Sequence, residues 1–177
     1  MANLSGLILA GAGSEADDLV RRLHGHSRYA MPLANRALVR YAAEALFASG
    51  VEEVAVAVSP ATIQDVDDIL GDGGTFGARF RYLELQNSHT ALDTISAARE
   101  LLGTERAMLV HSGDALVAAG LDVPLAEFAR SQPDVMMVCE RSHAYPAAAM
   151  AGARGAGPRN EGLGGLDHVA PAAIVSP

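Results

Sequence analysis

The sequence predicts an α/β protein in which helices cover both faces of a mostly parallel central sheet. Short runs rich in Val, Ile and Leu alternate with longer amphipathic stretches, which is typical of β-α-β units. The run at residues 54–58 is apolar throughout, as expected for a strand that is buried on both faces. The length of 177 residues fits one domain, so we expect residues 1–177 to share a single core.

The order of these elements along the chain follows from the same patterns. We expect strands at residues 4–10, 54–58, 80–85, 107–110, 135–139 and 169–175. We expect helices at residues 36–49, 62–70 and 90–102, each followed by a glycine that suits a helix C-terminus, namely Gly50, Gly71 and Gly103. A further helix begins near Pro124 and ends near Arg130. The apolar stripe of the first helix consists of Leu38, Tyr41, Ala42, Ala45 and Leu46.

Charge and composition exclude several classes of function. Thirteen cationic side chains, all of them arginine, are outnumbered by 21 acidic ones, which gives a formal charge of −8. This charge opposes binding to nucleic acid, and no basic stripe offsets it. No apolar run approaches the roughly 20 residues of a membrane span. No basic segment precedes an apolar stretch at the N-terminus. We therefore expect a cytoplasmic protein without nucleic-acid or membrane partners.

The single cysteine and a segment rich in Gly and Ala bear on the packing of the chain rather than on a catalytic site. Cys139 is the only cysteine and lies in an apolar run, so we expect a buried thiol and neither a disulfide nor a cysteine zinc site. Residues 141–168 are rich in Gly and Ala, above all between Ala147 and Gly165. Too few large apolar residues occur there to form a core, so we expect a mobile surface loop.

A glycine-rich turn follows the first strand. The run Gly11-Ala12-Gly13-Ser14 could wrap backbone N–H groups around a phosphate at the start of a helix. A turn of this kind is also common in parallel sheets in general. It lacks the third glycine and the Gly-Lys-Ser ending of the two familiar nucleotide fingerprints. Phosphate binding and a purely structural turn both stay open at this point.

Five ordered blocks carry a more specific signal. They are SRYAMPLANRAL at residues 27–38, ASGVEEV at 48–54, LGDG and FG within 70–77, the segment from Gln86 through HTA at 89–91, and LVHSGD at 109–114. Together they resemble the nucleotide-sugar pyrophosphorylases, in particular glucose-1-phosphate thymidylyltransferase, over residues 4 to about 140. The resemblance implies a Rossmann-like, GT-A-like nucleotidyltransferase fold, a three-layer α/β/α sandwich that binds ligands across the carboxyl ends of its strands.

The resemblance also implies a reaction and its ligands. The family joins a nucleoside triphosphate to a sugar 1-phosphate in biosynthesis and expels pyrophosphate, usually with magnesium. Positioning and charge neutralisation supply the rate of such transfers. The positions that match nucleotide contacts are Gly11, Ala12, Gly13, Gln86 and His89.

The cationic positions depart from the family pattern. The first loop of the family continues Gly-Thr-Arg, whereas this chain has SEADD at residues 14–18. One like charge within about 4 Å of a phosphate costs on the order of 4 kcal/mol, although these acidic residues would also favour the positive end of a helix. Arg28 stands where the family has its catalytic lysine, and a guanidinium still binds phosphate. The second family lysine, in a Glu-Lys-Pro motif, has no counterpart.

Asp114 matches the metal-binding aspartate that follows the fourth strand of the family. The resemblance implies a catalytic and metal-binding role for it, and a turn after Gly113 is the alternative. The second metal carboxylate has no counterpart, because Asp167 lies before the last expected strand. One carboxylate can hold magnesium through water and substrate phosphates. We therefore expect Mg²⁺, with Zn²⁺ or no metal as alternatives.

Histidines form the last group of candidates. The family geometry places four of them in loops near the cleft, at His24, His26, His89 and His111. With Asp114 they could make a zinc-type site or an acid/base pair in which His111 is catalytic. The alternative is that His24 and His26 are solvated and that His111 is a core side chain. His143 and Tyr145 lie where the family places sugar contacts.

Three functions remain open. The first is a shortened nucleotidyltransferase homologue with weakened or altered transfer because phosphate-binding cations are lost. Its contacts with a nucleotide or sugar phosphate would be Gly11, Gly13, Arg28, Gln86 and Asp114. The second is a repurposed enzyme in which His111, Asp114 and His89 do acid/base or metal-assisted chemistry on another small metabolite. The third is a non-catalytic protein that binds a partner. Homo-oligomers are compatible with all three.

Overall fold

The computed structural model describes residues 4–11, 15–85, 90–117, 120–138 and 172–177. The predictions for Cys139 and for residues 141–168 lie outside the described residues. Among the residues that are described, every helix is too short or too polar to span a membrane.

The expected strands and helices are present, with small shifts at their ends. The strands are β1 (Leu4–Ala10), β2 (Pro32–Leu33), β3 (Arg36–Ala37), β4 (Glu53–Val58), β5 (Arg79–Glu84), β6 (Ala107–Ser112), β7 (Val135–Val138) and β8 (Ala172–Val175). The α-helices are α1 (Glu15–His24), α2 (Leu38–Ala48), α3 (Ile63–Leu70), α4 (Ala91–Leu102) and α5 (Asp122–Ser131). Two 3-10 turns, η1 (Arg28–Ala30) and η2 (Gly74–Phe76), complete the list.

One six-stranded sheet organises the fold, with strand order β5-β4-β1-β6-β8-β7. Strand β1 lies at its centre and pairs in parallel with β4 on one side and with β6 on the other. Strand β5 extends the parallel set at one edge. Nearly every side chain of β1, β4 and β6 is buried, because helices lie on both faces of these strands.

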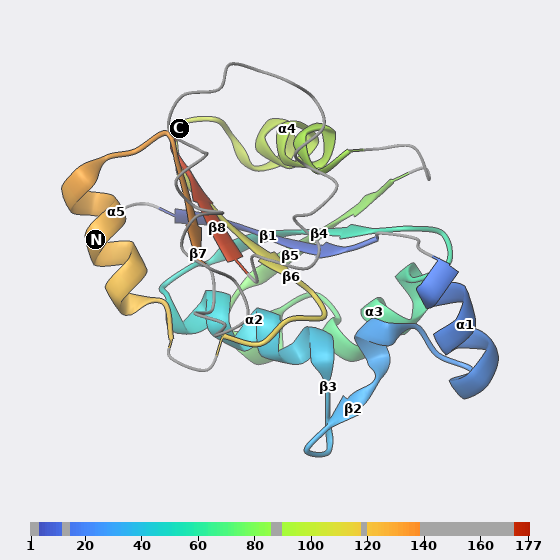
Figure 1. Cartoon of the computed structure of the whole chain (residues 1–177). Helices are drawn as coiled ribbons and strands as arrows, with labels where there is room; N and C mark the ends of the chain where they lie inside the picture. Colours follow the sequence, from blue (N-terminus) through green and yellow to red (C-terminus); the bar gives the residue numbers. More distant parts are fainter. Residues whose placement is uncertain (1–3, 12–14, 86–89, 118–119, 139–171) are drawn as a thin grey trace, which may run out of the picture.

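The core has two layers, one on each face of the sheet. Helices α2 and α3 lie on one face, and α4 lies on the other (Figure 1). The larger apolar cluster contains Ile8, Val56 and Leu109, and α5 packs against it through Leu125 and Phe128. The smaller cluster, under α4, contains Leu7, Ala57 and Met108. The alternation of odd and even residues along β1, β4 and β6 therefore fills both layers.

Helix ends follow the local sequence. Thr90 begins α4 with a reciprocal capping box, in which its hydroxyl accepts from the Asp93 N–H and the Asp93 carboxylate accepts from the Thr90 N–H. Gly71 and Gly103, as predicted, follow α3 and α4 with positive φ angles of 57° and 96°. These glycines adopt a backbone conformation that most other residues avoid.

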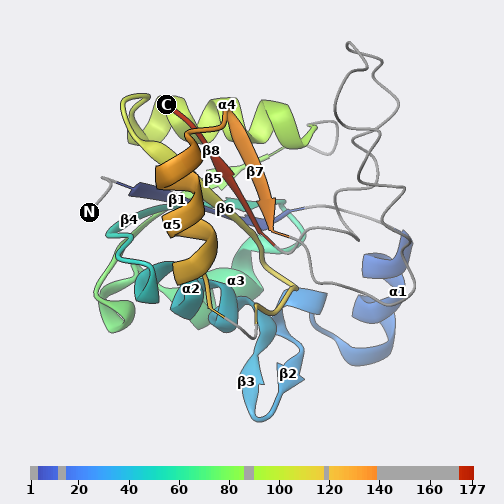
Figure 2. The same ribbon diagram turned by 60° about the vertical axis from the view of Figure 1, so that its left-hand side comes forward.

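The structure departs from the sequence prediction at the start of α2. We expected a helix from residue 36, but Arg36 and Ala37 pair with Pro32 and Leu33 in a short antiparallel hairpin. Its two loop residues, Ala34 and Asn35, have φ angles of 48° and 65°, the conformation that a two-residue hairpin requires. Figure 2 shows this hairpin projecting from the body of the molecule.

The predicted apolar stripe of α2 was also partly wrong. Ala42 and Leu46 are buried as expected, but the other fully buried positions are Val39 and Ala43. The predicted residues Leu38, Tyr41 and Ala45 are half-buried, because the helix is rotated so that its Val39 face meets the sheet.

One strand runs against the rest of the sheet. Strand β8 is antiparallel to both β6 and β7, so β7 is again parallel to β6. Val138 at the end of β7 is the register partner of Ala172 at the start of β8. On β7, at the edge of the sheet, Val135 and Met137 are exposed.

Candidate functional site

The order of the strands places a candidate site between β1 and β6. From β1 the chain crosses to β4 on one side, whereas from β6 it continues to β7 and β8 on the other side. Open α/β sheets bind ligands at such a switch point, outside the carboxyl ends of the strands. Here those ends are Ala10 and Ser112, and the residues that follow them decide what can be bound.

Glycines allow the backbone to approach closely at both strand ends. A Cβ atom on Gly11 would lie 2.8 Å from the carbonyl carbon of Val58. A Cβ atom on Gly113 would lie 3.0 Å from the Leu9 oxygen, which accepts a hydrogen bond from the Gly113 N–H at 2.8 Å. The ends of β1, β4 and β6 are thus packed backbone to backbone. Ala12 and Gly13, predicted as phosphate contacts, lie outside the described residues.

The side chain of Thr62 closes this edge on the side of β4. Its hydroxyl donates to the Ala10 carbonyl at 2.7 Å and accepts from the Ser59 N–H at 3.0 Å. Thr62 and Ser59 are both buried. These contacts satisfy polar groups that end-of-strand residues would otherwise leave unpaired, and they fix the backbone next to Gly11.

Arg28 and Asp114, the two most specific predictions, lie side by side. Nε of Arg28 is 3.1 Å from Oδ2 of Asp114, and the two side chains are 20% and 22% exposed. Nη2 of Arg28 also donates to the hydroxyl of Tyr29 at 3.1 Å. Oδ1 of Asp114 accepts a hydrogen bond from the hydroxyl of Ser112. The cation expected to bind phosphate and the carboxylate expected to bind metal therefore face each other.

Tyr29 is a contributor that the sequence did not single out. It is buried, and its ring lies against Gly113, where an added Cβ would come within 3.1 Å of Cδ1. The guanidinium carbon of Arg28 lies 5.1 Å from the centre of this ring. Tyr29 thus contacts the Arg28 guanidinium through its ring face and hydroxyl, and the same ring packs on Gly113 at the end of β6.

His111 lies inside the core beside this site. It is 1% exposed, and its Nδ1 lies 2.6 Å from the Ser112 carbonyl oxygen. Among the described residues, its Nε2 has no hydrogen-bond partner. Burial lowers the pKa of His111, although the Ser112 carbonyl and the Asp114 charge oppose the shift. The ring is therefore neutral at pH 7, and a catalytic role for it stays a prediction.

The other predicted histidines that the structure describes, His24 and His26, do not lie with His111 in the core. His24 and His26 are exposed at the end of α1 and in the loop after it. Gln86, His89, His143, Tyr145 and Asp167 lie outside the described residues.

The described residues do not form a metal centre by themselves. No group of three His, Cys, Asp or Glu side chains gathers in these parts of the chain. Asp114 is already engaged by Arg28 and Ser112. The donor set does not fit a magnesium or zinc ion held by the protein alone, because such ions take several oxygen or nitrogen ligands.

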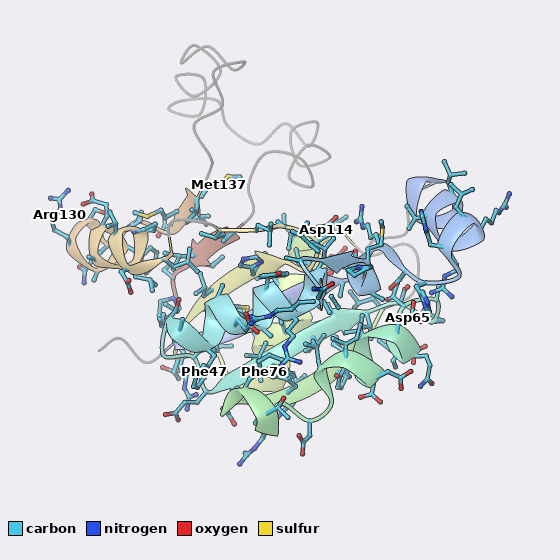
Figure 3. The ribbon with its side chains drawn as sticks, turned by 90° about the horizontal axis from the view of Figure 1, so that it is seen from below. Phe47, Asp65, Phe76, Asp114, Arg130 and Met137 are labelled. Atoms are coloured by element: carbon cyan, nitrogen blue, oxygen red, sulfur yellow. The ribbon has the colours of Figure 1, made fainter. Side chains whose placement is uncertain are left out.

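Asp65 is a second contributor that the sequence did not reveal. It lies on α3, and its Oδ2 accepts a hydrogen bond from the Ser27 N–H at 2.6 Å. Figure 3 shows Asp65 and Asp114 toward the α1 end of the molecule, whereas Arg130 and Met137 lie at the α5 end. An aspartate on a helix surface gives no sequence signal, because its partner is 38 residues away.

Comparisons with known proteins place the chain among nucleotidyltransferases. A family model described as "Nucleotidyl transferase" matches residues 5–148. A glucose-1-phosphate thymidylyltransferase of Streptomyces griseus is 25% identical over 139 residues, which cover 78% of this chain and 38% of that protein. One from Mycolicibacterium smegmatis is 25% identical over 129 residues, which cover 71% of this chain and 43% of that protein. The chain thus spans less than half the length of these relatives.

A solved structure shares the fold. It is a crystal structure of a Bacillus anthracis protein assigned as a glucose-1-phosphate thymidylyltransferase, in complex with sucrose. It superposes with a TM-score of 0.71 at 14% identity and covers 98% of this chain and 71% of that chain. This likeness confirms the Rossmann-like α/β fold predicted from the sequence.

Proposed function

Because the chain belongs to the nucleotidyl transferase family, we propose that it binds a nucleoside triphosphate and a sugar 1-phosphate beside Gly11, Arg28 and Asp114, and that its nucleotidyl transfer is weakened or altered. The resemblance to the nucleotide-sugar pyrophosphorylases, predicted from the sequence, is confirmed by the family match and by the thymidylyltransferase relatives. The identity of the two ligands is taken from the names of these relatives.

The observation that carries the proposal is the ion pair between Arg28 and Asp114. Nucleotidyl transfer depends on cations that neutralise the charge of the phosphates. In this chain the candidate cation already has a carboxylate as its partner. A phosphate that binds the Nε edge of Arg28 must displace Asp114 from it, so part of the binding free energy is spent on breaking the pair.

Displacement is nevertheless feasible. Arg28 and Asp114 are both partly exposed, so water can replace the broken contact, and a guanidinium binds phosphate in the same bidentate manner as carboxylate. A triphosphate carries more charge than one carboxylate, so it competes effectively for Arg28. The released Asp114 would stay near the phosphates and repel them. Binding therefore survives, but with lower affinity than an unpaired cation would give.

Nothing in this proposal runs through a metal ion held by the protein, because the described donor set does not fit one. Magnesium that arrives with the triphosphate remains a prediction. Asp114 would be its partner only after Arg28 has turned to the phosphate.

The experiment that tests the proposal combines calorimetry with a turnover assay. Wild-type protein is titrated with dTTP and with glucose 1-phosphate, and pyrophosphate release is followed with both present. We expect measurable binding and a turnover below that of the Streptomyces griseus relative assayed in parallel. No binding of either compound and no turnover would refute the function, and turnover equal to the relative would refute the weakening.

The variant Asp114→Asn separates the two roles of the carboxylate. Without magnesium, we expect it to bind dTTP about threefold to tenfold more tightly, because the carboxylate that competes with phosphate for Arg28 becomes a neutral amide and one like charge is lost. Asp122→Asn is the matched control, since it removes the same charge from exposed α5. Equal effects of the two variants would show that only net charge matters.

A further inference from the structure

Asp65 faces two groups that belong to other elements. Its Oδ2 accepts from the Ser27 N–H at 2.6 Å and lies 3.5 Å from Nη2 of Arg21 on α1. The Asp65 side chain is 19% exposed, and Ser27 is buried. One carboxylate of α3 therefore contacts both α1 and the residue directly before η1.

Ser27 is the residue directly before Arg28. It caps η1 in an extended conformation, and no side chain caps that turn. Its N–H is buried, so removal of Asp65 would leave the donor without its carboxylate partner, and such loss is costly inside a protein. Because η1 has only three residues, a shift at Ser27 moves Arg28 as well.

The other side of η1 is fixed by packing. Tyr29 is buried against Gly113, and the Met31 carbonyl accepts a hydrogen bond from the Leu38 N–H at 3.0 Å. Asp65 thus fixes the backbone directly before Arg28, and Tyr29 fixes the backbone directly after it. Together they limit the directions in which the Arg28 side chain can point. Asp65 thus contacts the backbone of Ser27, and the next residue, Arg28, contacts Asp114.

We propose that Asp65 is a positioning residue of this site, which fixes η1 so that the Arg28 guanidinium is held at the end of β6 for the anionic group of a ligand. The nature of that ligand rests on the function proposed above. The positioning itself is a property of the folded chain and is measurable without a ligand.

The charge of Asp65 suits this role. Burial raises the pKa of its carboxyl, but the hydrogen bond from the Ser27 N–H and the charges of Arg21 and His26 outweigh burial, so the pKa lies below its usual range. Asp65 is therefore ionised at neutral pH, where a charged acceptor makes the stronger hydrogen bond.

The test uses nuclear magnetic resonance on the whole chain without ligand. In Asp65→Ala we expect the Ser27 amide to exchange with solvent about tenfold faster, as for the loss of one hydrogen bond to a charged acceptor. We also expect the Nε–H signal of Arg28 to shift and broaden. Asp65→Asn keeps an oxygen that can accept from Ser27, so it should retain most of the order at Arg28 while α1 exchanges faster.

Two controls separate positioning from charge and from stability. Asp68→Ala removes a charge from an exposed position on the same helix, where it contacts Gln64. Val66→Ala destabilises α3 from its buried face. Neither should change the Arg28 signal. If Val66→Ala changes it as much as Asp65→Ala does, or if Asp65→Ala leaves Ser27 and Arg28 unchanged, the proposal is wrong.

A dTTP titration then connects positioning with binding. We expect Asp65→Ala to weaken binding about threefold to tenfold and Asp65→Asn to restore most of the affinity. Unchanged affinity in Asp65→Ala would overturn the link to the site. If wild-type protein binds neither dTTP nor glucose 1-phosphate, the proposed function fails, while the exchange data still decide the role of Asp65.

Discussion

Arginine and carboxylate side chains meet at both ends of the parallel strands, but in different arrangements. At the amino ends, Glu53 of β4 lies 3.5, 3.7 and 3.2 Å from nitrogens of Arg79, Arg81 and Arg106. At the carboxyl ends, within the described part of the chain, Asp114 pairs with Arg28 alone. The first arrangement places three guanidinium groups around one carboxylate, whereas the second places one guanidinium beside one carboxylate.

The difference shows how the same chemistry serves two purposes. Glu53 joins β4 to β5 and to the residue before β6, and Arg81 also donates to the Leu101 carbonyl at the end of α4. Loss of one arginine there leaves others in place. Arg28 and Asp114 join η1 to the end of β6 through one ion pair, and each keeps a hydrogen bond to a neighbouring hydroxyl, Tyr29 for Arg28 and Ser112 for Asp114, when that pair opens. The ion pairs at the amino ends thus suit a permanent link between strands. The ion pair at the carboxyl ends suits replacement of the carboxylate by the phosphate of a ligand.

The largest expected effect is the loss of ligand affinity in Arg28→Ala. A charge-assisted hydrogen bond contributes about 1.5–3 kcal/mol, so dTTP should bind at least tenfold more weakly. Arg79→Ala, which removes a cation from the other end of the sheet, should leave the affinity unchanged. Calorimetry on both variants checks this, and equal losses would erase the distinction between the two ends.

The next effect concerns the tight packing of the carboxyl ends. In Gly11→Ala the new methyl group meets backbone atoms of Val58 and Ser59, which cannot move aside as a side chain can. We expect a loss of about 1–3 kcal/mol in the free energy of unfolding, measured with urea. Gly74→Ala is the control, because its nearest neighbour is the Asp72 side chain. Similar losses in both would contradict the close approach at Gly11.

The pH dependence of stability sharpens the comparison at His111. Its folded pKa lies below the ordinary value of 6.5, so the unfolded chain binds a proton that the folded chain lacks. Stability should therefore fall as the pH drops below about 6.5, by at most about 1.4 kcal/mol per pH unit. His111→Gln should flatten this slope, and His24→Gln at an exposed position should not. Urea unfolding at a series of pH values decides between them.

The smallest effect is expected at the amino ends. Glu53→Gln leaves three guanidinium groups without their shared carboxylate, but these side chains are partly exposed. We expect a loss of no more than about 1 kcal/mol, which added salt should reduce by screening the repulsion. Affinity for dTTP should not change. A large loss of stability that salt does not affect would indicate that Glu53 acts by packing instead.

Most of the fold was readable because its signals are local. The apolar run of β4 predicts a strand buried on both faces, and glycines mark the ends of α3 and α4. The direction of β8 was not readable, because the period of a strand is the same whichever way it runs. The hairpin before α2 was hidden as well, since Ala34 takes a positive φ angle that alanine rarely adopts.

The candidate site was readable only in part. Arg28 and Asp114 were identified from the family resemblance, but their direct contact depends on how η1 packs against β6. Asp65 escaped notice because its effect passes through a backbone N–H. The burial of His111 had been left open, and the structure places it in the core.

The pairing of Val138 with Ala172 has a consequence for how such a protein diversifies. Because these two residues are register partners, the chain leaves β7 and enters β8 at neighbouring points of the sheet. Lengthening the sequence between them would raise the entropic cost of loop closure only slowly, by about 0.6 kcal/mol for each doubling of length. The ladder between β7 and β8 would not have to change.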